Sequence, residues 1–392
     1  MKASKPCCSK LSLIASAVLT CIASASTVAG SRVIQSDQNV VLFTSQGSAA
    51  NQSSAANNID YIRAQPLPLP QAFTQPLSLL DSLLEAQQNS KSPAAPKVFE
   101  GGQGNGKLNP VVLVPPGSSS AKALDEIVPQ ESGTANHVYT TSRTNAKNNA
   151  TTRYYPYSPA GKLWFKVNSA TYMCSASLIK PGVLVTAAHC VANFGKKKYY
   201  SGWQFAPGYD GGVAPFGVTT AKSVLVKASY FNGTDSCTQA GVVCQNDVAV
   251  IVLNKNLGNS CGWYGYGANN YSYVNKQVMI SQLGYPVAMD NGSSQQRTDS
   301  QGYVSSAMSN NTIIGSLQSN GSSGGPWLVN LGMAPTLNGT SFGPASQHNL
   351  VVGVTSWGYV DDTEKEQGAS PFTGSNIVSL VNSACSANPE AC

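Results

Sequence analysis

The chain has 392 residues, of which 42% are hydrophobic and 11% are charged, and its formal net charge is +6. This length allows two domains, or one domain with a segment that is removed later. The basic run at residues 196–198 (KKK) is interpreted as a solvated loop, so the composition predicts no nucleic-acid partner.

The N-terminus has the pattern of a secretory signal peptide. Lysines within the first ten residues are followed by an uncharged apolar run at 11–23, and small-residue cleavage sites lie at 23–25 and 27–29. The alternative, a membrane anchor, needs about 20 apolar residues, and this run is shorter. We therefore expect a signal peptide over residues 1–25, with cleavage as late as residue 29. After its removal we expect a secreted, extracellular monomer that passes through the periplasm in transit and has no membrane association.

Residues 26–155 differ in composition from the rest of the chain. They are rich in Ser, Asn, Gln, Ala and Pro, include the run 66–70 (PLPLP) and contain no cysteine. Residues 75–87 have apolar side chains at helical spacing and predict one short amphipathic helix. We interpret the region as a pro-segment that covers or chaperones the rest of the chain. The alternative is a disordered linker, which cannot bury enough apolar surface to fold alone. Candidate processing sites are Arg143, Lys147 and Arg153.

Residues 156–392 contain many short β-type runs. Examples are 163–167 (LWFKV), 183–185 (VLV), 248–253 (VAVIVL) and 350–355 (LVVGVT), and turn residues separate them. A helical pattern appears near the C-terminus, at residues 376–384. Many short strands between Gly and Asn turns predict an all-β barrel or sandwich, and the length of this region suits two small barrels that share a cleft.

Residues 321–326 (GSSGGP) contain a candidate nucleophile, Ser323, in a flexible backbone whose N–H groups can face an oxyanion. Acyl transfer by serine needs a base within hydrogen-bond reach, and histidine suits this role because its pKa lies near 7. His137 lies in the low-complexity region and His348 in a polar loop. His189 follows a β-type run and precedes a cysteine that can fix it. We therefore choose His189 as the base.

Asp247 is the candidate carboxylate that orients the histidine. It opens the apolar run 247–253 (DVAVIVL), and an acid at the head of a buried strand needs a partner, because burying it alone costs several kcal/mol. Other aspartates lie in polar loops and have the surroundings of solvated carboxylates: Asp210, Asp235, Asp290 and Asp299.

Residues 321–325 also satisfy the G-x-S-x-G pattern of the α/β-hydrolase nucleophile elbow. In that fold the order is Ser, acid, His, and a helix follows the serine. Here the last histidine is His348, the next acids come after it, and residues 326–329 (PWLV) predict a strand. The order His, Asp, Ser in this chain therefore argues against the esterase fold.

Four motifs of this chain resemble those of the trypsin/chymotrypsin-like serine peptidases and occur in the same order. They are residues 186–190 (TAAHC), 247–250 (DVAV), 321–326 (GSSGGP) and 356–358 (SWG), and the resemblance covers residues 162–381. Residues 262–266 (GWYGY) and 284–286 (GYP) are similar to the bacterial glutamyl-endopeptidase (V8-like) branch. The resemblance implies an all-β fold of two six-stranded antiparallel β-barrels. It places the active site in the cleft between them and a short helix at the C-terminus.

The resemblance also implies a role for each matching residue. Ser323, from the second barrel, attacks the scissile carbonyl. His189 takes its proton and Asp247 orients His189, both from the first barrel. The N–H groups of Gly321 and Ser323 form the oxyanion hole. The residues assigned to substrate binding are Leu317, Gln318, Ser356, Trp357 and Gly358, of which residues 356–358 should hydrogen-bond the substrate backbone as an edge strand.

Cysteines beyond the signal peptide are disulfide candidates in an exported chain. One pair, Cys174–Cys190, matches the bridge that closes the histidine loop in these peptidases. Two further pairs, Cys237–Cys244 and Cys385–Cys392, would close local loops, and Cys261 would then remain unpaired. No pair has C-x-x-C spacing and only 3 histidines are present, so we expect no metal site and no cofactor.

Several positions depart from the family pattern and leave the specificity open. Ser322 stands where trypsin-type zymogens have an aspartate that pairs with a new N-terminus, which puts ion-pair activation in doubt. Leu317 stands where an aspartate selects basic residues, and Thr355 stands where glutamyl endopeptidases have a histidine. The acidic stretch at residues 361–366 (DDTEKE) is interpreted as a solvated turn. The alternative is recognition of basic substrate residues or of calcium.

These features predict a secreted serine endopeptidase that is made as a precursor and acts on protein or peptide substrates through an acyl-enzyme. Two alternatives stay open. One is a non-catalytic binding protein on the same two-barrel scaffold. The other is esterase activity with the same triad.

Overall fold

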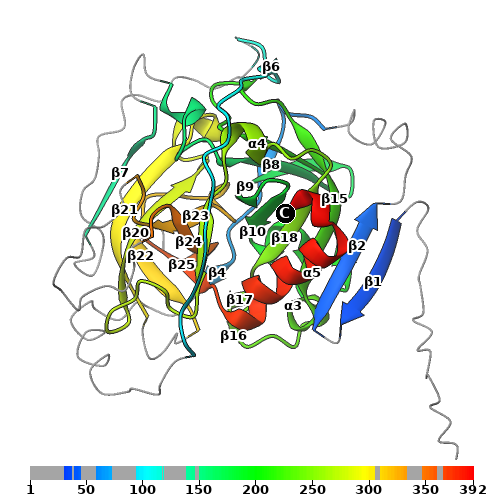
Figure 1. Ribbon diagram of the computed structural model, residues 1–392, viewed down its shortest axis with the longest axis vertical. Coiled ribbons are helices and arrows are strands. Elements are labelled where there is room, and N and C mark those ends of the chain that lie inside the picture. The colour runs from blue at the N-terminus through cyan, green and yellow to red at the C-terminus, as the bar shows by residue number, and fades with distance from the viewer. Residues whose placement is uncertain are drawn as a thin grey trace, which may run out of the picture.

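Two closed antiparallel β-barrels lie side by side in this protein (Figure 1). In this computed structural model the described residues are 31–37, 39–45, 59–72, 94–116, 118, 138–145, 150–304, 310–332, 347–359 and 365–392. A short helix, α5 (Ser379–Ala387), follows the last strand and packs against the first barrel. The predicted all-β architecture of two six-stranded barrels with a short C-terminal helix is confirmed.

The first barrel is built from strands rich in branched aliphatic residues. All side chains of β10 (Val183–Thr186) and β18 (Ala249–Leu253) are buried, and the two strands pair antiparallel. Branched side chains pack well on a pleated surface that is covered on both sides. Pairing between β15 and β18 closes the barrel. Its other strands are β8 (Ala160–Val167), β9 (Ala170–Lys180), β13 (Ser201–Pro207) and β15 (Thr219–Lys227).

The second barrel has a more polar interior, which also contains two buried tryptophans. Trp327 on β23 (Pro326–Val329) and Trp357 on β24 (Leu350–Tyr359) are buried, and pairing of these two strands closes the barrel. A buried indole N–H needs an acceptor. The Trp327 indole N–H donates a hydrogen bond to Thr355 Oγ1 at 2.9 Å, and the Trp357 indole N–H donates one to Asn311 Oδ1 at 2.8 Å. The other strands are β20 (Gln277–Gly284), β21 (Gln296–Tyr303), β22 (Thr312–Gly315) and β25 (Glu366–Pro371).

The described residues of the N-terminal region, 26–155, are paired with both barrels. β2 (Val40–Ser45) pairs with β15, and β7 (Tyr139–Arg143) pairs with β21. Strand pairing thus links parts of this region to both barrels. The predicted signal peptide and the predicted helix at 75–87 lie outside the described residues. The other strands of this region are β1 (Ser31–Asp37), β3 (Gln65–Pro66), β4 (Gln71–Ala72), β5 (Lys97–Phe99) and β6 (Val111–Val112).

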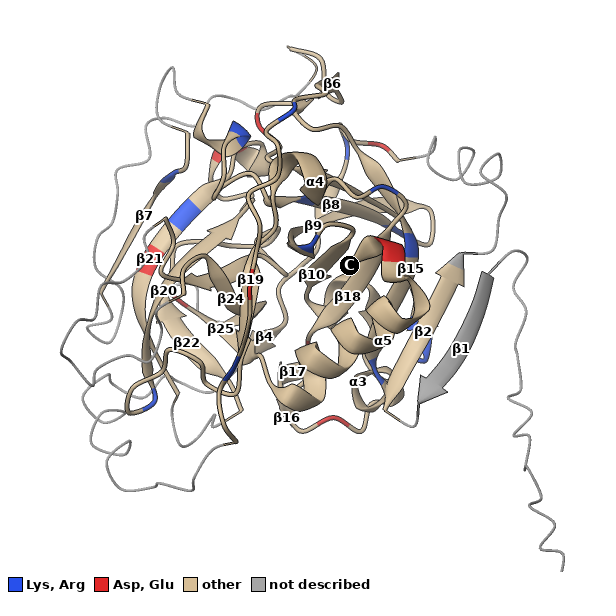
Figure 2. Cartoon of the chain, in the orientation of Figure 1, with Lys and Arg blue, Asp and Glu red and all other residues tan. Residues whose placement is uncertain are grey.

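Short elements complete the described chain. They are β11 (Ala192–Asn193), β12 (Lys198–Tyr199), β14 (Val213–Ala214), β16 (Cys237–Gln239), β17 (Val242–Cys244), β19 (Gly265–Ala268), α3 (Ala228–Asn232) and α4 (Gly258–Cys261). Among the helices of the described ranges, none has the length and apolar character needed to cross a membrane. Figure 2 shows the charged residues of the described part scattered over both barrels.

The structure contains the disulfides Cys174–Cys190, Cys237–Cys244 and Cys385–Cys392. Cys261 is free and buried, and its Sγ lies 3.2 Å from Leu257 O. Burial raises the pKa of the Cys261 thiol. Because the thiolate is the reactive form of cysteine, this residue is expected to be inert in the folded protein.

Lys162 is a buried lysine of the first barrel. Its Nζ donates a hydrogen bond to Gly292 O at 2.7 Å and lies 5.6 Å from the ring centroid of Trp164 and 5.2 Å from that of Tyr209. No carboxylate is among these contacts. Desolvation by burial lowers the pKa of Lys162 from 10.5 to about 7.

Because of this lowered pKa, the free energy of unfolding should rise as the pH is raised above 7. Between pH 7 and pH 10.5 the unfolded chain binds more protons at Lys162 than the folded chain does, so the free energy of unfolding rises with pH. The slope from one such group is at most about 1.4 kcal/mol per pH unit. Lys162→Met removes this contribution, so the stability of wild type relative to the variant should increase as pH rises. Urea unfolding from pH 7 upward measures it, and a constant difference would contradict the lowered pKa.

Candidate active site

Two neighbouring strands of the first barrel bring His189 and Asp247 together. β10 ends at Thr186, which lies opposite Ala249 at the start of β18. Because these strands are antiparallel, the chain leaving β10 and the chain entering β18 meet at one end of the barrel. His189 lies in the 3₁₀ helix Ala188–Cys190, just after β10, and Asp247 lies just before β18.

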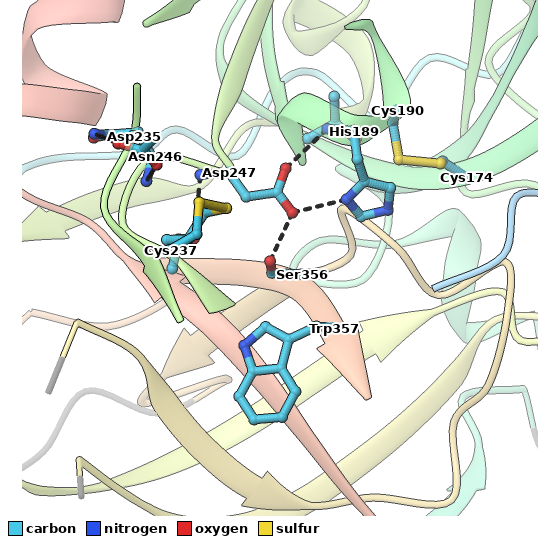
Figure 3. A network of polar contacts seen from close by, with 12 residues as sticks. Cys174, His189, Cys190, Asp235, Cys237, Asn246, Asp247, Ser356 and Trp357 are labelled. Atoms are coloured by element: carbon cyan, nitrogen blue, oxygen red, sulfur yellow. Dashed lines mark hydrogen bonds and ion pairs between the residues drawn. A yellow bond between two sulfur atoms is a disulfide. The ribbon is translucent and has the colours of Figure 1, made fainter. Parts of the chain in front are cut away.

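Asp247 is 1% exposed, and its carboxylate accepts hydrogen bonds from His189 and Ser356 (Figure 3). The His189 backbone N–H reaches Oδ1 at 2.8 Å, and His189 Nδ1 lies 2.8 Å from Oδ2. Ser356 Oγ donates to Oδ2 at 2.6 Å. A carboxylate in this position favours the tautomer with a proton on Nδ1, which leaves the lone pair of Nε2 free. The pair can therefore supply a base at His189 Nε2.

Ser323 lies in the loop before β23 and against the first barrel. Its carbonyl O accepts a hydrogen bond from Ser175 N on β9 at 2.8 Å, and a Cβ at Gly324 would collide with Thr186 Oγ1. This close approach sets the Ser323 loop beside the turn that carries His189. Ser323 Oγ and His189 Nε2 are both buried, and neither has a hydrogen-bond partner within the described residues. The bond between them is thus not formed here, and such catalytic contacts often tighten only with bound substrate.

Gly321 has a φ of 93°, which favours glycine, and a Cβ built there would lie 2.6 Å from Tyr285 O. The Asn320 carbonyl accepts a hydrogen bond from Val287 N at 2.9 Å. Because a trans peptide points its C=O and N–H in opposite directions, the Gly321 N–H points away from Val287. In the part of the chain that the structure describes, no protein group accepts a hydrogen bond from the N–H of Gly321 or Ser323. Both N–H groups are available to an oxyanion.

Ser175 belongs to the site and was missed from the sequence. Its Oγ donates to Gly321 O at 2.9 Å and accepts from Tyr285 N at 2.9 Å, and its N–H holds the Ser323 carbonyl. Ser175 therefore ties residues 321–325 (GSSGG) of the second barrel, here called the glycine loop, to β9 of the first. The sequence shows only a polar residue within the buried part of a strand, which does not distinguish Ser175 from Ser177.

Ser175→Ala should lower kcat by about tenfold and the free energy of unfolding by about 1–3 kcal/mol, because Gly321 O and Tyr285 N lose a buried partner. Ser177→Ala is the matched control. Ser177 lies on the same strand and is 0% exposed, and its Oγ has no partner among the described residues. Kinetics on a peptide substrate and urea unfolding measure the two effects. Equal results for both variants would rule out a positioning role for Ser175.

A pocket next to the glycine loop contains three of the residues assigned to substrate binding, Leu317, Gln318 and Gly358. Leu69 and Gln71 of the N-terminal region also line this pocket. The side chains of the other two assigned residues are used elsewhere, since Ser356 Oγ bonds to Asp247 and the Trp357 indole bonds to Asn311 in the barrel interior. Ser356 and Trp357 can therefore reach a substrate only through their backbone.

Two of the positions that depart from the family pattern, Ser322 and Thr355, are part of a buried network of polar side chains. Thr355 is 0% exposed, and its Oγ1 accepts from Gln282 Nε2 at 2.8 Å. Ser322 Oγ donates to Ser319 O at 2.7 Å, and Gln367 Nε2 donates to Ser322 Oγ at 3.3 Å. The hydroxyl of Ser322 is thus held by neutral groups of the second barrel.

The interpretation of residues 361–366 as a solvated turn is wrong for Glu366. This residue is 3% exposed and opens β25, where it pairs with Gly315. It is one of the residues that line the pocket beside the glycine loop, together with Gln318. Asp361, Asp362 and Glu364 lie outside the described residues.

Comparison with known proteins shows that this chain matches one family model and is similar to parts of two curated proteins. The family model described as Trypsin matches residues 150–377. An "Extracellular metalloprotease" of Bacillus subtilis (strain 168) is 31% identical over 132 residues, which are 31% of this chain and 37% of that protein. A "Glutamyl endopeptidase" of Bacillus licheniformis is 25% identical over 135 residues, which are 34% of this chain and 38% of that protein. The chain therefore spans less than two fifths of the length of these curated relatives.

One solved structure is similar over a larger share of its own length. The thermostable serine protease AL20 from an extremophilic microorganism is 23% identical, and the match covers 59% of this chain and 99% of that chain with a TM-score of 0.47.

Proposed function

The chain belongs to the trypsin family, and we propose that it is a serine endopeptidase that hydrolyses peptide bonds through Ser323, His189 and Asp247. The observation that carries this proposal is the Asp247 carboxylate, which binds both the backbone N–H and Nδ1 of His189. In the proposed reaction, Ser323 Oγ attacks the substrate carbonyl carbon and its proton passes to His189 Nε2. The peptide C–N bond then breaks, and His189 gives that proton to the leaving amine. Water, activated by the same base, then hydrolyses the acyl-enzyme.

The glycine loop is proposed to stabilise the charge that develops on the substrate carbonyl oxygen. The N–H groups of Gly321 and Ser323 have no protein acceptor in the described chain, and Ser175 holds the carbonyls of the same two residues. One such donor typically contributes about 3 kcal/mol to transition-state stabilisation, because it is fixed before the charge forms.

We propose further that the protein is exported and made as a precursor. The N-terminal sequence has the pattern of a signal peptide, and disulfides persist in oxidising compartments. One relative is named as extracellular. Arg143 and Arg153 are exposed residues ahead of the first barrel and remain candidate processing sites.

The name of the Bacillus subtilis relative raises a metal-dependent alternative, which the available ligand atoms do not fit. Within the described residues, two groups have ligand atoms close enough to share a metal ion, Cys174 with His189 and Cys190, and Asp235 with Cys237 and Cys244. All four cysteines are in disulfides, so neither group offers a thiolate. The serine mechanism is therefore preferred.

Incubation of the exported, processed protein with casein and a mixed peptide library tests the proposal. We expect cleavage at internal peptide bonds, mapped by mass spectrometry, together with fluorophosphonate labelling of the protein. Absence of both would favour a binding protein on the same scaffold. Hydrolysis of small esters without any peptide cleavage would favour the esterase alternative.

A further inference from the structure

Residues 59–72, here called the groove segment, cross from one barrel to the other (Figure 1). On the first barrel, the Tyr61 ring stands edge-on to Trp164 with the ring centroids 5.1 Å apart. β3 then pairs with β9, and Leu67 N donates to Met173 O at 3.0 Å. The segment is thus anchored on the strand that also carries Ser175.

The same segment then passes the glycine loop and joins the second barrel. Leu69 N donates to Asn320 Oδ1 at 2.9 Å, one residue before Gly321. Gly358 N donates to Pro70 O at 3.0 Å, and β4 pairs with β24. The Leu69 side chain is 8% exposed and lines the pocket that also contains Gly358. The groove segment therefore occupies the path between this pocket and β9.

The sequence at residues 65–70 (QPLPLP) suits this position. Proline at every second residue has no N–H that needs a partner, and it favours an extended chain. The N–H groups that remain within the PLPLP run, those of Leu67 and Leu69, are the two that bond to the barrels. Leu69 is buried whereas Pro68 is exposed. The face of the segment that carries Leu69 therefore packs against the protein, and the face that carries Pro68 is exposed.

The groove segment runs in the direction opposite to a substrate. In the proposed reaction the leaving amine lies by His189 of the first barrel, and the side chain of the acyl residue enters the pocket beside Gly358 of the second. A substrate therefore runs from β24 toward β9, from its N-terminus to its C-terminus. The groove segment runs from Met173 on β9 to Gly358 on β24, and both of its pairings are parallel. A substrate in the opposite direction would pair antiparallel with these strands.

We propose that the groove segment is an intramolecular inhibitor, bound backwards in the substrate groove. This inference rests on the proposed function of Ser323 and His189. In the reversed direction each peptide nitrogen lies on the β24 side of its carbonyl, so His189 cannot protonate it as a leaving group. The segment therefore blocks the groove without being cut. Ser323 and His189 are 0% and 7% exposed, which fits a covered site.

The test uses the full exported chain and the rate at which a small fluorophosphonate labels Ser323. Leu69→Asp places a carboxylate at a buried position, and Pro68→Asp places the same charge one residue away at an exposed position. We expect Leu69→Asp to be labelled at least about tenfold faster than wild type, because a buried leucine contact is lost and the carboxylate favours water. Pro68→Asp should be labelled like wild type. Leu67→Asp, which loosens the segment at the first barrel, should also be labelled faster.

A synthetic peptide of residues 59–72, added to the Leu69→Asp protein, tests the direction of binding. It should slow the labelling of Ser323 and stay uncut, whereas a peptide of the same residues in reverse order should not slow it. Equal labelling of all four proteins, or cleavage of the peptide within residues 65–72, would overturn the inference and leave the proposed function intact. Absence of labelling in every protein, before and after proteolytic removal of the N-terminal region, would overturn both.

Discussion

Ser323→Ala should lower kcat for peptide hydrolysis by about 10⁶-fold. The alanine has no oxygen to attack the carbonyl, and without it the base at His189 has no nucleophile to activate. Fold and stability should change little, because Ser323 Oγ has no hydrogen-bond partner within the described residues. Steady-state kinetics on a peptide found in the library experiment measures the loss, and thermal unfolding checks the fold.

A matched control for this change is Ser223→Ala. Ser223 is a buried serine of β15 whose Oγ also lacks a partner in the described chain, and it lies outside the site. This variant should keep the wild-type kcat. Near-normal activity of Ser323→Ala would mean that another residue is the nucleophile.

Asp247→Asn should lower kcat by about 10⁴-fold, the size of this effect in a Ser-His-Asp triad. The shape of the side chain is kept, but an amide in place of the carboxylate favours the wrong tautomer of His189 and cannot stabilise its charged form. Nε2 would then carry the proton and could not accept one from Ser323. Kinetics over a range of pH measures the loss, and near-normal activity would show that another carboxylate orients His189.

Asp235→Asn is the matched control for the carboxylate. Asp235 accepts hydrogen bonds from Asn246 N at 2.8 Å and Asn246 Nδ2 at 2.6 Å, so it holds the residue before Asp247 without touching His189 (Figure 3). We expect this variant to lose about 1 kcal/mol of stability and to change kcat by less than about tenfold. A loss equal to that of Asp247→Asn would point to a general disturbance of the loop.

The two barrels could be predicted because the sequence carries two kinds of signal for them. One is the short apolar run of each strand, and the other is the order of the catalytic motifs along the chain. Continuous apolar runs such as those of β10 and β18 are typical of buried strands, and the order of His189, Asp247 and Ser323 separates this fold from the α/β-hydrolases. Ser175 could not be predicted, because its role depends on a contact between two barrels that are distant in sequence. Glu366 was misjudged because a run of acidic residues indicates solvent, whereas strand pairing decided its burial.

The groove segment shows a second limit of sequence reasoning. Its composition is compatible with a pro-segment and with a linker, and neither reading gives the strands that it contacts, whereas in the structure β3 and β4, each 2 residues long, pair with β9 and β24. The PLPLP run indicates an extended conformation but not the surface that it covers. That surface exists only once both barrels have formed.

The chemical identity of the nucleophile tests the proposed mechanism most directly. The protein, freed of its N-terminal region by proteolysis, should react with a fluorophosphonate to give one adduct, and peptide mapping by mass spectrometry should place that adduct on Ser323. Ser323→Ala should give no adduct, and Asp247→Asn should react far more slowly. An adduct on a different residue, or peptide cleavage that persists in Ser323→Ala, would contradict the mechanism.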